Sequence, residues 1–219
     1  MPRIVDHEER RREVAAAVLR VVARSGLNGV TMREVAAESG WSTGVLSHYF
    51  DSKRHLLHEA LVEVSRQAGL HLREAIGLQR TPLATLRALL EEMLPLDERR
   101  TALCQVFSYF YGEGAAGGAT AKELSSYYRV WRRFVCDAIV AGQTDGSIRD
   151  DVNPELMAEV LVSMADGLGL QATFDRTALP PERQRQHVEA LVHFLTPPQR
   201  RPPGQQVVSA PSPAAHSAR

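Results

Sequence analysis

The sequence contains only two cysteines, no long apolar run and no apolar signal core at its charged start. Cys104 and Cys136 lie inside apolar helical patterns, which predicts no disulfide framework and favours a reducing compartment. No uncharged run approaches the ~20 residues that a membrane span needs. We therefore expect a soluble, cytoplasmic protein with no membrane partner.

Net charge is also absent, because 26 cationic side chains balance 26 acidic ones. Only two of the cations are lysines, Lys53 and Lys122. Residues 1–55 carry nine cations against seven acids, and residues 197–219 carry three arginines and no acid, so residues 56–196 have a net charge of −5. A mildly basic first segment on an acidic body fits a protein that meets phosphate at one end.

Strand-type alternation is missing, and nearly every patterned segment has helical periodicity. In residues 8–25, for example, Val14, Val18 and Val21 share one face, and Gly26 with the Asn28-Gly29 pair is expected to end the helix. The sequence thus predicts an all-α fold of about nine helices. The expected helices cover about residues 8–25, 31–39, 42–50, 52–76, a segment that begins at Pro82, 97–111, 120–144, 154–174 and 181–195.

The most informative run is TMREVAAESGWSTGVLSHYFDSK, residues 31–53. Thr31 and Glu34 have the spacing of a capping box, Ser42 is placed to cap a second helix, and Gly40 suits the left-handed backbone of a tight turn. Two short helices joined in this way are typical of a helix-turn-helix, whose second helix lies in the major groove of DNA. The same pattern is compatible with an ordinary helical hairpin in an α-helical core. The apolar side chains expected to pack the two helices are Val35, Ala36, Val45, Leu46 and Phe50.

The other residues of this run supply the polar side chains that a DNA-reading helix needs on its outer side. Thr43, Ser47 and His48 share the exposed face of the second helix and can hydrogen-bond base edges. Tyr49 and Lys53 would add phosphate contacts, which position a protein without specifying the sequence. The predicted DNA-binding residues are Thr31, Arg33, Ser42, Thr43, Gly44, Ser47, His48, Tyr49 and Lys53.

The pattern T-x-x-x-V-A-x-x-S-G-W-S-x-G-x-L-x-x-Y-F-x-S-K-x-x-L, residues 31–56, resembles the DNA-binding domain of TetR-family repressors. The stretch GWSTGVLSHYF and residues 128–149 are most similar to the branch of choline-responsive repressors of glycine-betaine synthesis. The resemblance implies a helix-turn-helix DNA-binding domain in residues 1–56 and a helical effector-binding and dimerisation domain in residues 57–196. It also implies a homodimer on a palindromic double-stranded DNA operator, released when the effector binds. The proline-rich residues 197–219 are expected to form a disordered tail.

Two positions depart from the common pattern of that family. Ser47 stands where many members have Tyr, so the usual aromatic contact with DNA is in doubt there. Trp41 stands where Val or Ile is commoner. We expect Trp41 to plug the turn against the first helix, the alternative being a hydrogen bond from its indole N–H to the DNA backbone.

Eight of the thirteen aromatic side chains lie between residues 107 and 134. An aromatic-lined cavity binds an apolar or cationic effector, and a cage of Trp and Tyr faces suits a quaternary ammonium. The resemblance to the choline-responsive branch implies choline as one such effector. The alternative is that the cluster is simply part of the core. The predicted ligand-binding residues are Phe107, Tyr111, Tyr128, Trp131 and Phe134.

Small and apolar residues also form stripes along the last two expected helices. Two such faces from each subunit would make a four-helix bundle across a two-fold axis. Packing within one chain would give the same stripes. The predicted dimer-interface residues are Leu161, Ala165, Leu168, Val188, Leu191, Val192 and Leu195.

Three other functions are compatible with isolated features. Residues 112–117 match G-x-G-x-x-G with Asp137 at the offset of a ribose-binding acid, but a nucleotide-using enzyme would need a strand before the glycines. His55 and His58, with Glu59, lack a further nearby ligand for a metal. The third is a helical dimeric binding protein without DNA recognition. We expect no enzyme, no catalytic residue, no metal and no cofactor.

Overall fold

The structure is a computed structural model that describes residues 7–198, apart from the side chains at 7, 67–72 and 75. Across that range it has nine helices and no strand, which confirms the all-α prediction. No described helix is long and apolar enough to span a membrane. The helices are α1 (His7–Gly29), α2 (Met32–Ser39), α3 (Thr43–Tyr49), α4 (Lys53–Gly77), α5 (Pro82–Glu92), α6 (Glu98–Ala115), α7 (Gly118–Thr144), α8 (Pro154–Phe174) and α9 (Pro181–Leu195).

Polar caps fix the start of the helices around the helix-turn-helix. The hydroxyls of Thr31 and Ser42 accept hydrogen bonds from the backbone N–H groups of Glu34 at 3.1 Å and Val45 at 3.2 Å. Gly40 ends α2 with φ 77°, in the left-handed region that favours glycine. Both predicted caps and the predicted turn are confirmed.

The range of α1 joins two helical segments that meet at Gly26. Gly26 adopts φ 64° and interrupts the helical backbone there, but the chain resumes helical geometry up to Gly29. The N–H of Val30 then donates to the carbonyl of Leu27 at 3.3 Å. Because glycine tolerates positive φ, Gly26 ends the first helical segment as predicted, and the short segment after it ends at Gly29, within the predicted Asn28–Gly29 stop.

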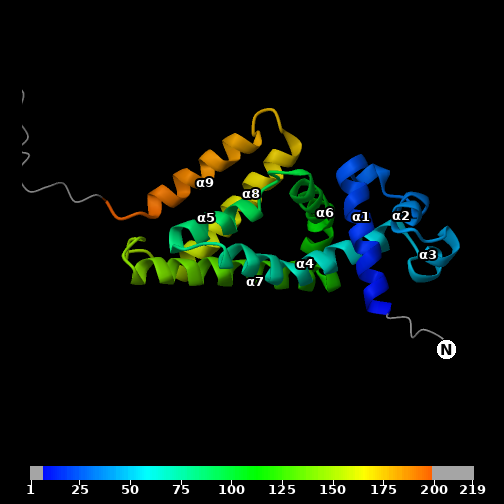
Figure 1. The fold of residues 1–219 in the computed structure, drawn as a ribbon, viewed down its shortest axis with the longest axis horizontal. Helices are drawn as coiled ribbons and strands as arrows, with labels where there is room; N and C mark the ends of the chain where they lie inside the picture. Colours follow the sequence, from blue (N-terminus) through cyan, green and yellow to red (C-terminus); the bar gives the residue numbers. More distant parts are fainter. Residues whose placement is uncertain (1–6, 199–219) are drawn as a thin grey trace, which may run out of the picture.

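The buried side chains form two cores. The first joins α1 to α4 with one face of α6, for example Val18, Leu46 and Leu57 with Val106 and Phe110. The second joins α5, α7, α8 and α9. Helix α4 runs from the end of the molecule that holds α2 and α3 into the body, and α6 lies between α1 and the helices α5, α8 and α9 (Figure 1).

The helix stripe predicted as a dimer interface faces the second core, so that choice of residues needs correction. Five of the seven residues are at most 3% exposed in the single chain and have almost no surface left for a partner. The remaining two, Leu168 and Leu191, are partly buried against the same core. The residues assigned to the core in place of the dimer interface are Leu161, Ala165, Leu168, Val188, Leu191, Val192 and Leu195.

The opposite face of α8 carries the exposed apolar side chains. Leu156, Val160 and Met164 follow one another at intervals of four and are 61%, 41% and 48% exposed. Residues four apart share one face of a helix. This outer row, named here the α8 outer face, is available to a partner. The predicted tail, apart from Pro197 and Pro198, lies outside the described residues.

Candidate functional site

Helices α2 and α3 separate their side chains into a buried and an exposed set. Leu46 and Phe50 are buried in the first core, together with Val35 and Ala36 of α2. Val45, which was predicted to pack there, is 42% exposed on the outer face instead. Since an apolar side chain can contact the methyl group of thymine, Val45 joins the residues that a groove could meet.

The predicted DNA-binding side chains lie almost entirely on the exposed side. Those on α3, including Thr43, Ser47 and His48, are exposed, and Tyr49 is half-buried. Arg33 on α2 is exposed as well, with its side chain 87% accessible. The others that are exposed are Thr31, Ser42 and Gly44.

Lys53 has a structural contact that the sequence did not reveal. Its ammonium donates a hydrogen bond to the carbonyl of Leu27, at the end of α1. This contact ties the start of α4 to the first helix. An ammonium has three donors, so the bond leaves two for another acceptor.

Two arginines of α1 hold α2 in place. Arg20 and Arg24 donate to the carboxylate of Glu38 at 2.6 Å and 2.7 Å. These hydrogen bonds, that from Arg20 first, hold the pKa of Glu38 below its ordinary value. The carboxylate therefore stays ionised, and the orientation of α2 on α1 is fixed at neutral pH.

Trp41 lies at the turn between α2 and α3 and is partly buried against the first core, as the plug interpretation expects. Its ring meets Tyr49 edge-on, with centroids 5.7 Å apart. The guanidinium carbon of Arg10, on α1, lies 5.3 Å from the centroid of the indole. The turn is thus held between the first and third helices.

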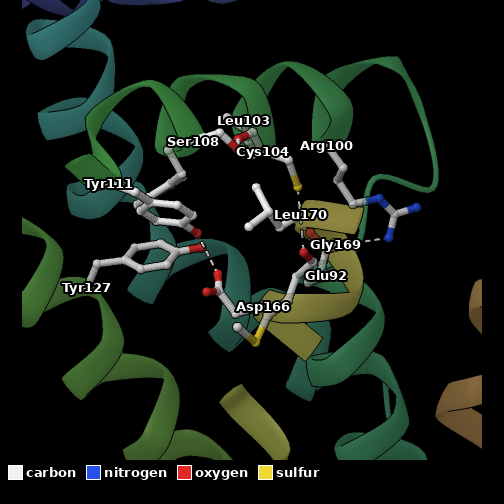
Figure 2. Close-up of a pocket in the computed structure, with 12 residues that line it drawn as sticks. Glu92, Arg100, Leu103, Cys104, Ser108, Tyr111, Tyr127, Asp166, Gly169 and Leu170 are labelled. Carbon is white, nitrogen blue, oxygen red and sulfur yellow. Dashed lines mark hydrogen bonds and ion pairs between the residues drawn. The ribbon is translucent and has the colours of Figure 1, made fainter. Parts of the chain in front are cut away.

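A second candidate site lies in the body, between α6, α7 and α8 (Figure 2). The cavity has a volume of about 30 Å³, which is room for one or two water molecules. Aromatic rings from α6 and α7 form one side, and α8 closes the other. The lining residues include Met93, Leu103, Cys104, Phe107, Tyr111, Tyr127, Asp166 and Leu170.

Asp166 is the centre of a hydrogen-bonded cluster at this cavity. Its Oδ1 accepts from the hydroxyl of Tyr111 at 2.6 Å and from that of Tyr128 at 2.7 Å. The two hydroxyls are 2.9 Å apart. Oδ2 has no hydrogen bond, and Asp166 has no ion pair, among the described residues. The half-buried carboxylate is thus held by neutral donors alone.

Burial and the neighbouring carboxylate suppress ionisation around the cavity. Burial first, and then the hydrogen bond to Asp166, raises the pKa of Tyr111. Burial likewise raises the pKa of Tyr128, with Tyr111 and Asp166 adding to the effect. The thiol of Cys104 has its pKa raised to about 12, again mainly by burial. The hydroxyls therefore remain protonated donors, and Cys104 is an unreactive thiol.

The other charged residues at the cavity are already paired. The carboxylate of Glu92 forms salt bridges with Arg99 at 2.8 Å and with Arg100 at 3.3 Å. Arg100 also pairs with Asp97 at 2.8 Å. Asp166 is consequently the carboxylate of this lining whose charge the described side chains leave uncompensated.

The structure places only some of the predicted aromatic residues at this cavity. Phe107 and Tyr111 line the cavity, and Tyr128 reaches it through Asp166. Trp131 is buried in the second core beside Tyr127, and Phe134 lines a separate groove between α4, α5 and α7. Asp166 was missed, because a lone acid in an apolar helix gives no periodic signal.

The features behind the alternative functions have ordinary structural roles. The glycines of residues 112–117 close α6 and open the turn into α7, with no strand before them, and Asp137 lies within α7. His55 lies 3.7 Å from Glu59, within one helix. Among the side chains that the structure describes, no group of three or more potential metal ligands comes together.

Two family models match the chain. The C-terminal domain of BetI-type transcriptional repressors matches residues 82–197, more than half of the chain. Bacterial regulatory proteins of the tetR family match residues 14–60, which span the helix-turn-helix. The chain belongs to the TetR family. It is therefore a helix-turn-helix transcriptional regulator of the repressor type, with a C-terminal ligand-binding domain.

Relatives that match this chain over most of their length are transcriptional regulators. The regulator PksA of Bacillus subtilis is 27% identical over 197 residues, which cover 87% of this chain and 94% of PksA. The regulator BetI of Cronobacter sakazakii is 28% identical over 178 residues, 78% of this chain and 83% of BetI. Homologues of this kind are regulators and not enzymes.

Solved structures of transcriptional regulators share the fold. A regulator from Rhodococcus sp. Rha1 superposes with a TM-score of 0.68 and 26% identity, over 84% of this chain and 95% of that one. One from Saccharomonospora viridis, solved in complex with choline, superposes with a TM-score of 0.75 and 24% identity, over 87% of this chain and all of that one.

Proposed function

We propose that this chain is a homodimeric repressor that binds a palindromic operator and is released by a small organic cation. The observation that carries the DNA-binding part is the division of α3 into a buried face, with Leu46, and an exposed polar face. Thr43, Ser47 and His48 on that face read base edges in the major groove. The nearby groups, Lys53 among them, bind phosphate and set the position of the helix.

The effector binds at the cavity between α6, α7 and α8. A partly buried charge is costly unless it is paired. Asp166 supplies an anion that a ligand can pair, beside the rings of Phe107, Tyr111 and Tyr127. Aromatic faces attract cations. This combination favours a cation over a purely apolar effector, and the choline complex of the Saccharomonospora viridis regulator makes a quaternary ammonium the first compound to test.

Release follows from the size of the cavity. A volume of about 30 Å³ holds one or two waters and no organic cation, so a bound effector must move α6 away from α8. Helix α6 shares the first core with α1 and α4 through Val106 and Phe110. The same movement therefore reorients the helix-turn-helix, and the effector favours a state whose two recognition helices no longer match successive major grooves.

The two-fold partner packs on the α8 outer face. Its row of Leu156, Val160 and Met164 is apolar and exposed, as the core of a homodimer interface must be before assembly. A two-fold dimer presents two recognition helices to half-sites about one helical turn apart, ~34 Å.

Selection of bound fragments from the organism's own genomic DNA tests the DNA-binding part. We expect enrichment of a fragment with an inverted repeat, bound less tightly as salt concentration rises. A protein that enriches no fragment over unselected DNA would overturn the proposal. Enrichment of a single, unrepeated half-site would overturn the dimeric mode of binding.

A further inference from the structure

The three arginines at the start of α1 have different partners. Arg11 pairs with Glu59 of α4 at 2.8 Å, and Arg12 pairs with Glu8 on its own helix at 3.1 Å. Arg10 has no acidic partner among the described residues. Its guanidinium instead lies over the ring of Trp41, 5.3 Å from the centroid. Arg10 is thus the arginine of this run that is directed at the helix-turn-helix.

The contact leaves the donors of Arg10 available. A cation–π contact uses the face of the aromatic ring, whereas the five N–H groups of a guanidinium point outward in its own plane. Contact with a fixed ring also removes part of the rotamer freedom that a long side chain would otherwise lose on binding. Arg10 is therefore a pre-organised cation with unused donors.

The surroundings of Arg10 belong to the exposed surface of the helix-turn-helix. Trp41 meets Tyr49 at 5.7 Å, and Tyr49 meets His48 at 5.5 Å between ring centroids. Arg10, Trp41, Tyr49 and His48 thus form a continuous row from α1 to α3. A guanidinium with free donors at the end of that row matches the geometry and charge of a phosphate group.

We infer that Arg10, held by Trp41, is a phosphate anchor that fixes the approach of α3 to DNA. The inference rests on the proposed DNA-binding function and adds a contact outside the helix-turn-helix itself. It also assigns a role to the tryptophan at the turn: Trp41 acts through Arg10 as a positioning residue and need not touch DNA. The contact is sequence-independent, so it contributes equally on operator and on random DNA.

The test compares Arg10→Ala with Arg11→Ala, which removes the same charge from the neighbouring position. Binding of the full chain to two labelled duplexes, one selected from genomic DNA and one of random sequence, is measured by anisotropy across a salt series. Loss of one phosphate contact lowers the magnitude of the slope of log affinity against log salt by about 0.9. We expect this change for Arg10→Ala on both duplexes, with a several-fold weaker affinity at low salt, and no comparable change for Arg11→Ala.

The variant Trp41→Leu tests the contribution of the ring contact while the charge of Arg10 is kept. Leucine keeps an apolar plug at the turn and removes the ring face, so we expect part of the Arg10→Ala loss, and no additional loss when both changes are combined. Thermal melting shows whether each variant is folded. If the wild-type protein binds DNA, two results would overturn the inference. One is a salt slope in Arg10→Ala equal to that of the wild type, and the other is an equal loss of affinity in Arg10→Ala and Arg11→Ala. Absence of wild-type binding would instead remove the proposed function.

Discussion

Arg54 and Glu113 join the first turn of α4 to the end of α6. Nε of Arg54 donates to Oε2 of Glu113 at 3.0 Å, and a second guanidinium nitrogen contacts Oε1. Thr120 donates to the same carboxylate at 2.6 Å. Arg54 follows Lys53 directly, and Glu113 is two residues beyond Tyr111 of the cavity. The pair therefore connects the helix-turn-helix to α6, the helix that we propose an effector moves.

Glu113→Gln should weaken the response to effector more than it weakens operator binding. The neutral amide cannot hold the guanidinium of Arg54 as a carboxylate does, so movement of α6 is transmitted less completely to α4. The measurement is the ratio of operator affinities without and with choline. Glu189→Gln is the matched control, because it breaks the Arg87–Glu189 pair between α5 and α9. An unchanged ratio in Glu113→Gln would contradict the role given to the pair.

The same variant gives a pH test. The hydrogen bond from Arg54 first, and then that from Thr120, holds the pKa of Glu113 below its ordinary value. A lowered pKa adds stability that is complete above the unfolded-state pKa, about 4.3, and is lost as pH falls through the folded-state pKa. The melting temperature of the wild type should be higher than that of Glu113→Gln near neutral pH. The difference between the two melting temperatures should disappear in acid. A difference in melting temperature that persists in acid would show that the charge of Glu113 is not the cause of the difference.

Asp166→Asn should weaken binding of a cationic effector at least about tenfold, which corresponds to ~1.4 kcal/mol. The side chain keeps its shape and its hydrogen bond acceptor but loses the negative charge that a cation would pair. Operator affinity without effector should stay as in wild type. Calorimetric titration with choline measures the change, and Tyr128→Phe, which removes one donor and keeps the charge, should cost less. Equal choline affinity in Asp166→Asn and wild type would exclude Asp166 as the counterion.

Val160→Glu should convert the protein from dimer to monomer. The charge would be placed in the middle of the α8 outer face, where burial against a partner leaves it unpaired. Operator binding should weaken with it, since a monomer contacts one half-site. Leu78→Glu is the control, because Leu78 is 81% exposed and lies outside α8. Sedimentation velocity reports the state, and a Val160→Glu dimer as tight as wild type would place the interface elsewhere.

Alanine at His48 and alanine at Lys53 should have different effects. His48→Ala should relax base preference at one operator position by about 1–3 kcal/mol of discrimination. Lys53→Ala should weaken binding to every sequence, lower the salt slope by about 1, and also lower the melting temperature because Lys53 holds the Leu27 carbonyl. Affinities for a set of single-base operator variants distinguish these patterns. Identical profiles would disprove the division between base and phosphate contacts.

Local rules were sufficient for the caps and the turn of the helix-turn-helix. The caps at Thr31 and Ser42 depend on a hydroxyl and an N–H three residues away, and the turn at Gly40 depends on the φ of one residue. Such features are contained in a few consecutive residues, so a single sequence predicts them. The family resemblance added the function that spacing alone left open.

Features that depend on distant residues were not predictable in this way. Helix α8 is apolar on more than one side, so its sequence does not tell whether Leu161 or Val160 faces the core; packing against α5, α7 and α9 decides it. The pairing of Asp166 with Tyr111 joins positions 55 apart, and that of Lys53 with Leu27 joins positions 26 apart. Neither leaves a periodic signal in the chain.

The most direct test of the whole account is release of the operator by a cation. Full-length protein bound to its selected operator is titrated with choline, with betaine aldehyde and with 3,3-dimethyl-1-butanol, the uncharged carbon analogue of choline, while anisotropy follows the DNA. We expect at least one of the two cations to dissociate the operator complex at millimolar concentration, and the uncharged analogue to leave the complex intact. Operator affinity that is the same with and without both cations, or equal release by the analogue, would contradict it.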